Sequence, residues 1–125
     1  MPNVALVMSI FTDDLWKESF TFPNYTYSYS AFLRAVAKFP MFCNENNDSS
    51  ISLDSSCRRE LAVILAQITV DTADLQGVSD SNCSDPNNIK AECDYKSGNQ
   101  KETLIWPPIN GVQYYGRGAL QLEWN

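Results

Sequence analysis

The sequence QYYGRGALQLEWN, residues 113–125, decides how the rest of the chain is interpreted. Two adjacent tyrosines precede Gly116-Arg117-Gly118, and glycine on both sides of Arg117 predicts a tight turn with backbone angles that a side chain disfavours. The alternation over residues 119–124 predicts a short β-element. Such a turn brings a cation and two aromatic rings together, an arrangement that suits the apolar faces and hydroxyl edges of sugars. A hairpin corner with a solvated arginine is the alternative interpretation.

Length, composition and charge limit the classes to which the chain can belong. Its 125 residues suffice for one domain, and a hydrophobic content of 44% suffices for a core. The net charge of −6 argues against a nucleic-acid partner, because phosphate recognition needs a basic face. No apolar run approaches the roughly 18 residues of a membrane span. Residues 1–11 lack the basic start and the long apolar run of a signal peptide, so we expect a mature product or a piece of a longer protein.

Cysteines and glycosylation sequons point to the secretory pathway. The four cysteines allow three disulfide pairings, of which we prefer the two local ones, Cys43–Cys57 and Cys83–Cys93. Their spacing and the absence of histidine leave little support for a metal site. Three Asn-X-Ser/Thr sequons begin at Asn24, Asn47 and Asn82. Sequons together with an even cysteine count predict an extracellular, N-glycosylated protein.

Two stretches in the first third of the chain carry the signals of short helices. Thr12, followed by two aspartates, is typical of a capped helix start. A second helix is expected after a cap at Ser28 or Ser30, and Pro40 ends it. Its predicted core stripe consists of Phe32, Val36 and Phe39.

The strongest helix pattern covers about residues 56–72, after a cap at Asp54 or Ser55. Apolar residues at i, i+3, i+4 and i+7 predict a buried face, which Ala62 and Ala66 would widen. The stripe consists of Leu61, Ile64, Leu65 and Ile68. Beyond this helix, the region from residue 76 to residue 104 is polar and lacks periodicity, so we expect an irregular region there.

Four blocks of the sequence, in the right order, resemble the family 19 chitinases, which are glycoside hydrolases. Residues 114–125 are similar to the family signature Tyr-Tyr-Gly-Arg-Gly-Pro-Ile-Gln-Leu-Ser/Thr-Trp-Asn, and Trp106-Pro107 precedes it as Trp-Pro does there. Residues 22–40 resemble a Phe-Tyr-Thr-Tyr…Phe-Pro segment, and residues 59–72 resemble an Arg-Glu-Ile-Ala-Ala-Phe-Leu-Ala-Gln-Thr-Ser-His-Glu-Thr helix. The loop between Cys43 and Cys57 looks more like the animal members. The resemblance implies a mainly α, lysozyme-like fold, in one partial domain over residues 1–125 without the second lobe of the cleft.

The resemblance also implies a reaction, the cleavage of β-1,4-linked N-acetylglucosamine polymers with inversion. Inversion needs a carboxylic acid and a carboxylate base roughly 6.5–9.5 Å apart, with the attacking water between them. The family's acid, a glutamate, falls on Asp71, and the histidine before it becomes Val70. The family's base falls nearest to Asp85, with Glu92 as a less well-placed candidate. Glu123 stands where the family has a Ser or Thr that holds the water, and it either replaces the base or faces solvent.

Other residues match the family's substrate cleft. By the resemblance, the expected sugar-binding residues are Tyr114, Tyr115, Arg117, Gln121 and Asn125. The family's Gly-Gly after the long helix is replaced by Asp74 and Leu75, so the backbone is expected to leave the helix by another path.

The substituted acid and the unclear base favour a catalytically degenerate domain. Such a domain would bind chitin or a related polysaccharide, or would serve as a structural glycoprotein that associates with itself. The alternative is an active inverting endochitinase with Asp71 as the general acid. No cofactor is expected in either case.

Overall fold

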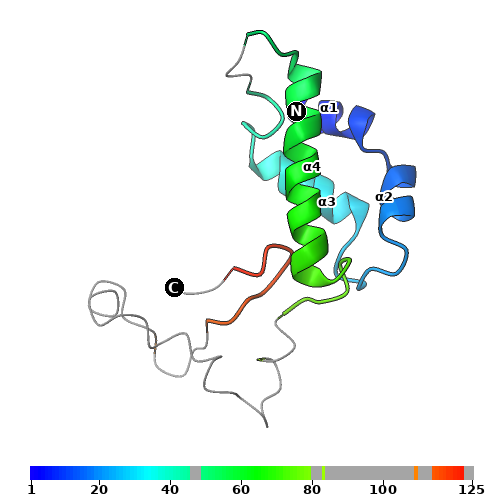
Figure 1. The fold of residues 1–125 in the computed structure, drawn as a ribbon, viewed down its shortest axis with the longest axis vertical. Coiled ribbons are helices and arrows are strands. Elements are labelled where there is room, and N and C mark those ends of the chain that lie inside the picture. The colour runs from blue at the N-terminus through cyan, green and yellow to red at the C-terminus, as the bar shows by residue number, and fades with distance from the viewer. Residues whose placement is uncertain (46–48, 80–82, 84–108, 110–113, 123–125) are drawn as a thin grey trace.

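One long helix, α4, organises the fold, which a computed structural model describes over residues 1–45, 49–79, 83, 109 and 114–122. The helices are α1 (Pro2–Ile10), α2 (Asp13–Ser19), α3 (Tyr29–Lys38) and α4 (Leu53–Thr72). α1 packs against both α3 and α4, and α2 lies on the same side of α4 as α1 (Figure 1). The described residues contain four helices and no strand, so the prediction of a mainly α fold is confirmed.

The first helix was not expected from the sequence. Proline at its first position suits a helix start, because its fixed φ is helical and its missing N–H would have no partner there. Asn3 is buried, and its Nδ2 donates to the carbonyl oxygens of Val36 and Phe39, each at 3.1 Å. Both carbonyls lie at the C-terminal end of α3, where the last carbonyl groups lack the N–H donors of a following helical turn. The Asn3 side chain therefore joins the first helix to the end of the third.

The core on the α2 side of the molecule is a cluster of aromatic rings. The Trp16 ring centroid lies 4.9 Å from that of Phe20 and 5.6 Å from that of Phe32. Phe11 meets the Phe32 ring edge-on at 6.1 Å, a geometry that aromatic quadrupoles favour. The Tyr29 hydroxyl donates to the carbonyl oxygen of Phe11 at 2.7 Å, which satisfies its polar end inside the cluster. These contacts fix α2 and α3 relative to the end of α1.

The caps of α2 and α3 agree with the sequence. Thr12 Oγ1 accepts from the N–H of Leu15, and Ser28 Oγ accepts from the N–H of Ala31. Ser28, rather than the alternative Ser30, is therefore the cap. Phe39 was expected in the core, but 66% of it is exposed. Its backbone has left the helical region at φ −118° and ψ 79°, so its side chain no longer follows the α3 stripe.

α4 begins earlier than the sequence suggested. Ser52 caps it by accepting from the N–H of Ser55, so the expected cap at Asp54 or Ser55 is wrong. Asp54 lies in the first turn and pairs with Arg58 at 2.6 Å. Ala62 and Ala66 are exposed, because the buried stripe of α4 stays narrow. That stripe is confirmed, and it consists of Leu61, Ile64, Leu65 and Ile68.

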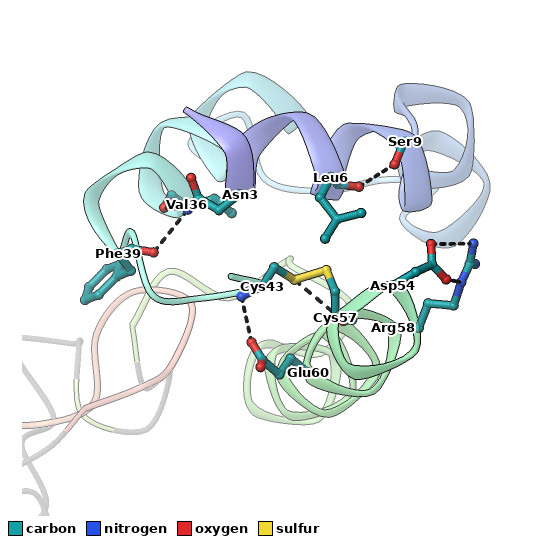
Figure 2. Close-up of a disulfide and its surroundings, with 10 residues drawn as sticks. All are labelled: Asn3, Leu6, Ser9, Val36, Phe39, Cys43, Asp54, Cys57, Arg58 and Glu60. Carbon is teal, nitrogen blue, oxygen red and sulfur yellow. Dashed lines mark hydrogen bonds and ion pairs between the residues drawn. A yellow bond between two sulfur atoms is a disulfide. The ribbon is translucent and has the colours of Figure 1, made fainter. Parts of the chain in front are cut away.

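A disulfide fixes the N-terminal part of α4. Cys43 and Cys57 are bonded, with Cα atoms 4.4 Å apart, which confirms the expected pair (Figure 2). The Glu60 carboxylate accepts from the N–H of Cys43 at 2.8 Å, so the next turn of α4 holds the same loop residue. Cys83 is also disulfide-bonded, and its expected partner Cys93 lies outside the described residues.

Candidate functional site

The C-terminal end of α4 is shaped by the buried hydroxyl of Thr72. Thr72 Oγ1 donates to the carbonyl oxygen of Ile68 at 2.6 Å and accepts from the N–H of Leu75 at 2.8 Å. Ala73, Asp74 and Leu75 all have positive φ, at 48°, 60° and 63°. The chain thus leaves the helix through a left-handed turn, a conformation that glycine favours, although no glycine stands there.

Asp71 lies in the last turn of α4 and is half-buried. Gln67, one turn earlier, donates from Nε2 to the Asp71 carboxylate at 2.7 Å and so fixes its direction. Val70, at the position where the resemblance places the family's histidine, is 79% exposed. Asp71 therefore has an oriented carboxylate without an imidazole beside it.

The predicted turn at residues 116–118 lies beside the segment that follows α4. The N–H of Gly118 donates to the carbonyl oxygen of Val78 at 2.9 Å, and Arg117 forms an antiparallel bridge with Ser79. Figure 1 shows the segment after α4 and the orange-to-red segment of residues 114–122 at the same, C-terminal end of α4. Because residues 78 and 79 follow α4 so closely, the turn lies at the same end of α4 as Asp71.

The two glycines of the turn serve different purposes. Gly118 has φ 73°, so the predicted left-handed geometry is confirmed there. Gly116 is buried, and a Cβ on it would lie 3.1 Å from the Gln121 carbonyl oxygen and 2.8 Å from Gln121 Oε1, so close packing favours glycine at that position. Gln121 closes the turn by donating from Nε2 to the carbonyl oxygen of Gly118 at 2.8 Å. The Gln121 amide, expected to bind sugar, therefore has a structural partner.

The expected β-element after the turn is not seen in the described part, residues 119–122. Gln121 has φ 46°, so the chain turns again instead of extending. An isolated bridge between Arg117 and Leu122 closes this turn. The alternating pattern therefore reflects two sides of a turn rather than two faces of a strand.

A cation lies over an aromatic ring at this turn, as the sequence predicted. The Arg117 guanidinium carbon is 3.8 Å from the centroid of the Tyr115 ring, and Arg117 Nη1 donates to the Tyr115 carbonyl oxygen. Tyr114 is directed differently, because its hydroxyl accepts from the N–H of Ile109 at 3.1 Å. The expected sugar-binding pair therefore separates into a Tyr115–Arg117 stack and a Tyr114 that supports the preceding chain.

A third segment, the loop between α2 and α3, reaches the same place, and sequence reasoning missed it. The N–H of Asn24 donates to the carbonyl oxygen of Leu75 at 2.8 Å. The Tyr27 hydroxyl donates to the carbonyl oxygen of Gly77 at 2.9 Å, and burial raises the pKa of that phenol above its ordinary value. Residues 75–79 thus hold the α2–α3 loop through Leu75 and Gly77 and the turn at residues 116–118 through Val78 and Ser79.

An apolar cavity of about 640 Å³ opens between α3, α4 and the turn. Its walls are mainly hydrophobic, and Lys38 is the one charged residue among the described residues that line it. Ala119 and Leu120 line the cavity from the turn, and Ile64 and Ile68 line it from α4.

Several expected site residues lie outside the described residues. These are the candidate bases Asp85, Glu92 and Glu123, the cleft residue Asn125, and the sequon residues Asn47 and Asn82. The distance between Asp71 and a base is therefore not defined. Asn24, the remaining sequon residue, is described and half-buried. None of the helices in the described part is long and apolar enough to cross a bilayer.

Comparisons with known proteins agree with the motifs. Residues 14–125 match the model of the Glyco_hydro_19 family, "Chitinase class I". Endochitinase A of Zea mays is 34% identical over 99 residues, which cover 79% of this chain and 29% of that protein. Acidic endochitinase SP2 of Beta vulgaris is 36% identical over 99 residues, with the same two coverages of 79% and 29%. The chain therefore spans less than a third of the length of these curated relatives.

The fold also has a counterpart among solved structures. Chitinase C from Streptomyces griseus HUT6037 superposes with a TM-score of 0.63 at 23% identity, over 92% of this chain and 48% of that chain. This match confirms the mainly α, lysozyme-like fold. These relatives come from plants and a bacterium, so the expected likeness to animal members is not supported. With nearly all of its length matched by the family model, the chain belongs to glycoside hydrolase family 19, the class I chitinases.

Proposed function

We propose that this chain is a chitinase-type domain that binds β-1,4-linked N-acetylglucosamine polymers and has lost most or all of the family's catalytic activity. The observation that carries the proposal is the meeting of three segments at one end of α4. Residues 75–79 bring the Tyr115–Arg117 stack to the end of the helix that bears Asp71. Aromatic rings with polar groups at their edges suit a sugar face and its hydroxyls.

The proposed loss of activity rests on Asp71. Aspartate is one methylene shorter than the family's glutamate, and a displacement of about 1 Å at a reacting group costs on the order of 100-fold in rate. The imidazole that would lie beside the acid is replaced by Val70, whose exposed apolar side chain offers no hydrogen bond. Binding does not need this acid, so the domain can keep affinity for the polymer without turnover.

Calorimetric titration with chitohexaose tests the proposal. The wild-type chain is expected to bind, and Arg117→Ala is expected to weaken binding roughly tenfold, because the cation over Tyr115 is lost. Arg58→Ala is a matched control, since it removes an exposed arginine from the opposite end of α4. If the wild-type chain shows no heat of binding at millimolar sugar, the proposed function is wrong.

An active inverting endochitinase with Asp71 as the acid is the second candidate. The hydrogen bond from Gln67 favours it, because a directed carboxylate is what a proton donor needs. Early in the reaction, NMR of the product would then show the α-anomer. Turnover that Asp71→Asn abolishes would establish the enzyme and contradict the degenerate domain. No turnover in either protein, with binding intact, would support the binding domain.

The proposal includes an extracellular location and N-glycosylation. The Cys43–Cys57 disulfide fits an oxidising compartment. Asn24 lies in a turn that its own side chain closes by accepting from the N–H of Thr26 at 3.0 Å. The intact mass of the secreted protein is expected to fall on enzymatic removal of N-glycans. In Asn24→Gln, this fall is expected to be smaller by the mass of one glycan. An unmodified mass would contradict this part of the proposal.

Self-association is the last part of the proposal. Val63 and Val70 lie two turns apart on α4, and they are 71% and 79% exposed. Exposed apolar residues that share a helix face favour association. Sedimentation velocity at micromolar concentration is expected to show oligomers that the double variant Val63→Ser/Val70→Ser disperses. A monomer at every concentration would rule out an assembly role.

A further inference from the structure

The loop between α2 and α3 presents two aromatic side chains to solvent. Tyr25 is 96% exposed and Phe22 is 81% exposed. Apart from Phe39, the other described aromatic side chains are buried or half-buried. Single exposed hydrophobic residues are ordinary on protein surfaces. Two aromatic residues on one short loop therefore need further observations before they indicate a site.

The first such observation is that hydrogen bonds hold this loop in place. The N–H of Tyr27 donates to the carbonyl oxygen of Asn24 at 2.8 Å, and the N–H of Thr26 donates to Asn24 Oδ1 at 3.0 Å. The N–H of Asn24 in turn donates to the carbonyl oxygen of Leu75. The backbone that carries Tyr25 is therefore fixed before any ligand binds, and a fixed aromatic residue loses little conformational entropy on binding.

The second observation is that the loop adjoins the proposed sugar site. Leu75 and Gly77 hold the loop, and Val78 and Ser79 hold the turn at residues 116–118. Four peptide steps separate Leu75 from Ser79, so they lie at most about 14 Å apart along the chain. A polymer of several sugar units is therefore long enough to contact both places.

The chemistry of the loop selects a neutral sugar as its ligand. Residues 20–28 (FTFPNYTYS) contain no charged side chain and combine aromatic rings with hydroxyl and amide groups. A loop without lysine or arginine does not suit nucleic acid or anionic lipid. The apolar face of a pyranose ring can stack on an aromatic ring while its hydroxyl edges stay hydrated.

We propose that Tyr25, supported by Phe22, is an additional sugar-binding position of this domain, where a ring of the N-acetylglucosamine chain stacks beyond the Tyr115–Arg117 stack. This inference rests on the proposed function, because it extends the same bound polymer. It makes the domain selective for chain length. Long oligomers reach both the Tyr115–Arg117 stack and Tyr25, whereas chitobiose reaches only one of them.

Titration of the full chain with chitobiose and chitohexaose tests the inference. Tyr25→Ala is expected to weaken chitohexaose binding roughly tenfold and to leave chitobiose binding within twofold of wild type. Tyr25→Phe keeps the ring and is expected to stay close to wild type. Phe39→Ala, which removes an exposed ring at the other end of α3, is the matched control and is expected to change neither affinity.

The outcomes separate the inference from the proposed function. If the wild-type chain binds and Arg117→Ala weakens binding, but Tyr25→Ala does not change chitohexaose affinity, the inference is overturned and the proposed function stands. An equal loss of affinity for both sugars would also overturn it, because Tyr25 would then bind the same sugar unit as the Tyr115–Arg117 stack. If the wild-type chain binds neither sugar, the proposed function fails and the inference fails with it. Unchanged thermal unfolding of Tyr25→Ala excludes a folding defect.

Discussion

The two ends of α4 are held in different ways. At the N-terminal end, the Cys43–Cys57 disulfide and the Glu60 carboxylate fix one loop residue against the helix. At the C-terminal end, the contacts of the turn after Thr72 with two other segments are hydrogen bonds and a short β-bridge. In Figure 1 the N-terminal end lies near the start of α1, and the C-terminal end lies near the turn at residues 116–118.

We expect this difference to separate the stability of the fold from the proposed sugar binding. A disulfide stabilises the fold whatever lies nearby, whereas the hydrogen-bonded end sets the relative positions of Asp71, Tyr115 and the α2–α3 loop. Of the candidate site residues that the structure describes, Asp71, Tyr115 and Arg117 all lie at the hydrogen-bonded end. We therefore expect changes at the N-terminal end to affect unfolding, and changes at the C-terminal end to affect binding as well.

The largest effect on stability is expected from removal of the disulfide at the N-terminal end of α4. The double variant Cys43→Ala/Cys57→Ala opens a loop with a sequence separation of 14 residues, and it is expected to lower the free energy of unfolding by about 3 kcal/mol. Urea unfolding measures this loss. Chitohexaose affinity, measured below the unfolding transition, is expected to remain near that of wild type. A large loss of affinity in the folded variant would show that the two ends are coupled.

The second-largest effect is expected from a change at the C-terminal end of α4. Thr72→Val keeps the side-chain shape but leaves the buried N–H of Leu75 without its acceptor, which costs about 2 kcal/mol. Because Leu75 begins the segment that holds both neighbouring loops, sugar affinity is expected to fall as well. Thr72→Ser, which retains the hydroxyl, is the control and is expected to keep most of the affinity. Equal binding by the valine and serine variants would contradict the positioning role of the hydroxyl.

The features of the fold that were predicted correctly from the sequence are those that depend on neighbouring residues. The caps at Thr12 and Ser28 and the apolar stripe of α4 depend on residues within a turn or two, so pattern and propensity sufficed. The disulfide pair was correct because a short polar loop separates the two cysteines. α1 was missed because it has no side-chain cap and no clear polar face. The buried role of Asn3 depends on carbonyls more than thirty residues away, which no local pattern contains.

The site was predicted in part for the same reason. The turn at Gly118 and the cation over Tyr115 follow from neighbouring residues, and both were anticipated. The expected β-element is not seen in the described residues 119–122, because Gln121 adopts positive φ to close the turn, a conformation that alternation does not reveal. The contact of the α2–α3 loop with residues 75–77 was missed because its acceptors are backbone carbonyls, which are present at every residue.

A smaller effect concerns the link between the two loops. Tyr27→Phe removes the hydrogen bond to the Gly77 carbonyl and is expected to lower the free energy of unfolding by about 1 kcal/mol at neutral pH. Burial raises the pKa of Tyr27 in the folded state, so the phenol stays protonated there more readily than in the unfolded chain. Its contribution is therefore complete below a pH of about 10 and is lost as the pH rises further. Urea unfolding across this range is expected to show a smaller alkaline loss for Tyr27→Phe than for wild type.

The smallest effect tests the left-handed turn itself. Asp74 is exposed and has φ 60°, where a residue with a side chain is strained by roughly 1–2 kcal/mol, although aspartate tolerates this region better than most. Asp74→Gly relieves that strain but gives the unfolded chain more freedom, so we expect a net stabilisation of less than about 1 kcal/mol. Asp74→Asn separates the two causes, because it removes a carboxylate that disfavours a helix C-terminus while leaving the backbone preference nearly unchanged. A gain with glycine but not with asparagine locates the strain in the backbone. A gain in stability of equal size with both variants shows that the carboxylate charge destabilises the turn. The left-handed backbone of Asp74 would then contribute no strain.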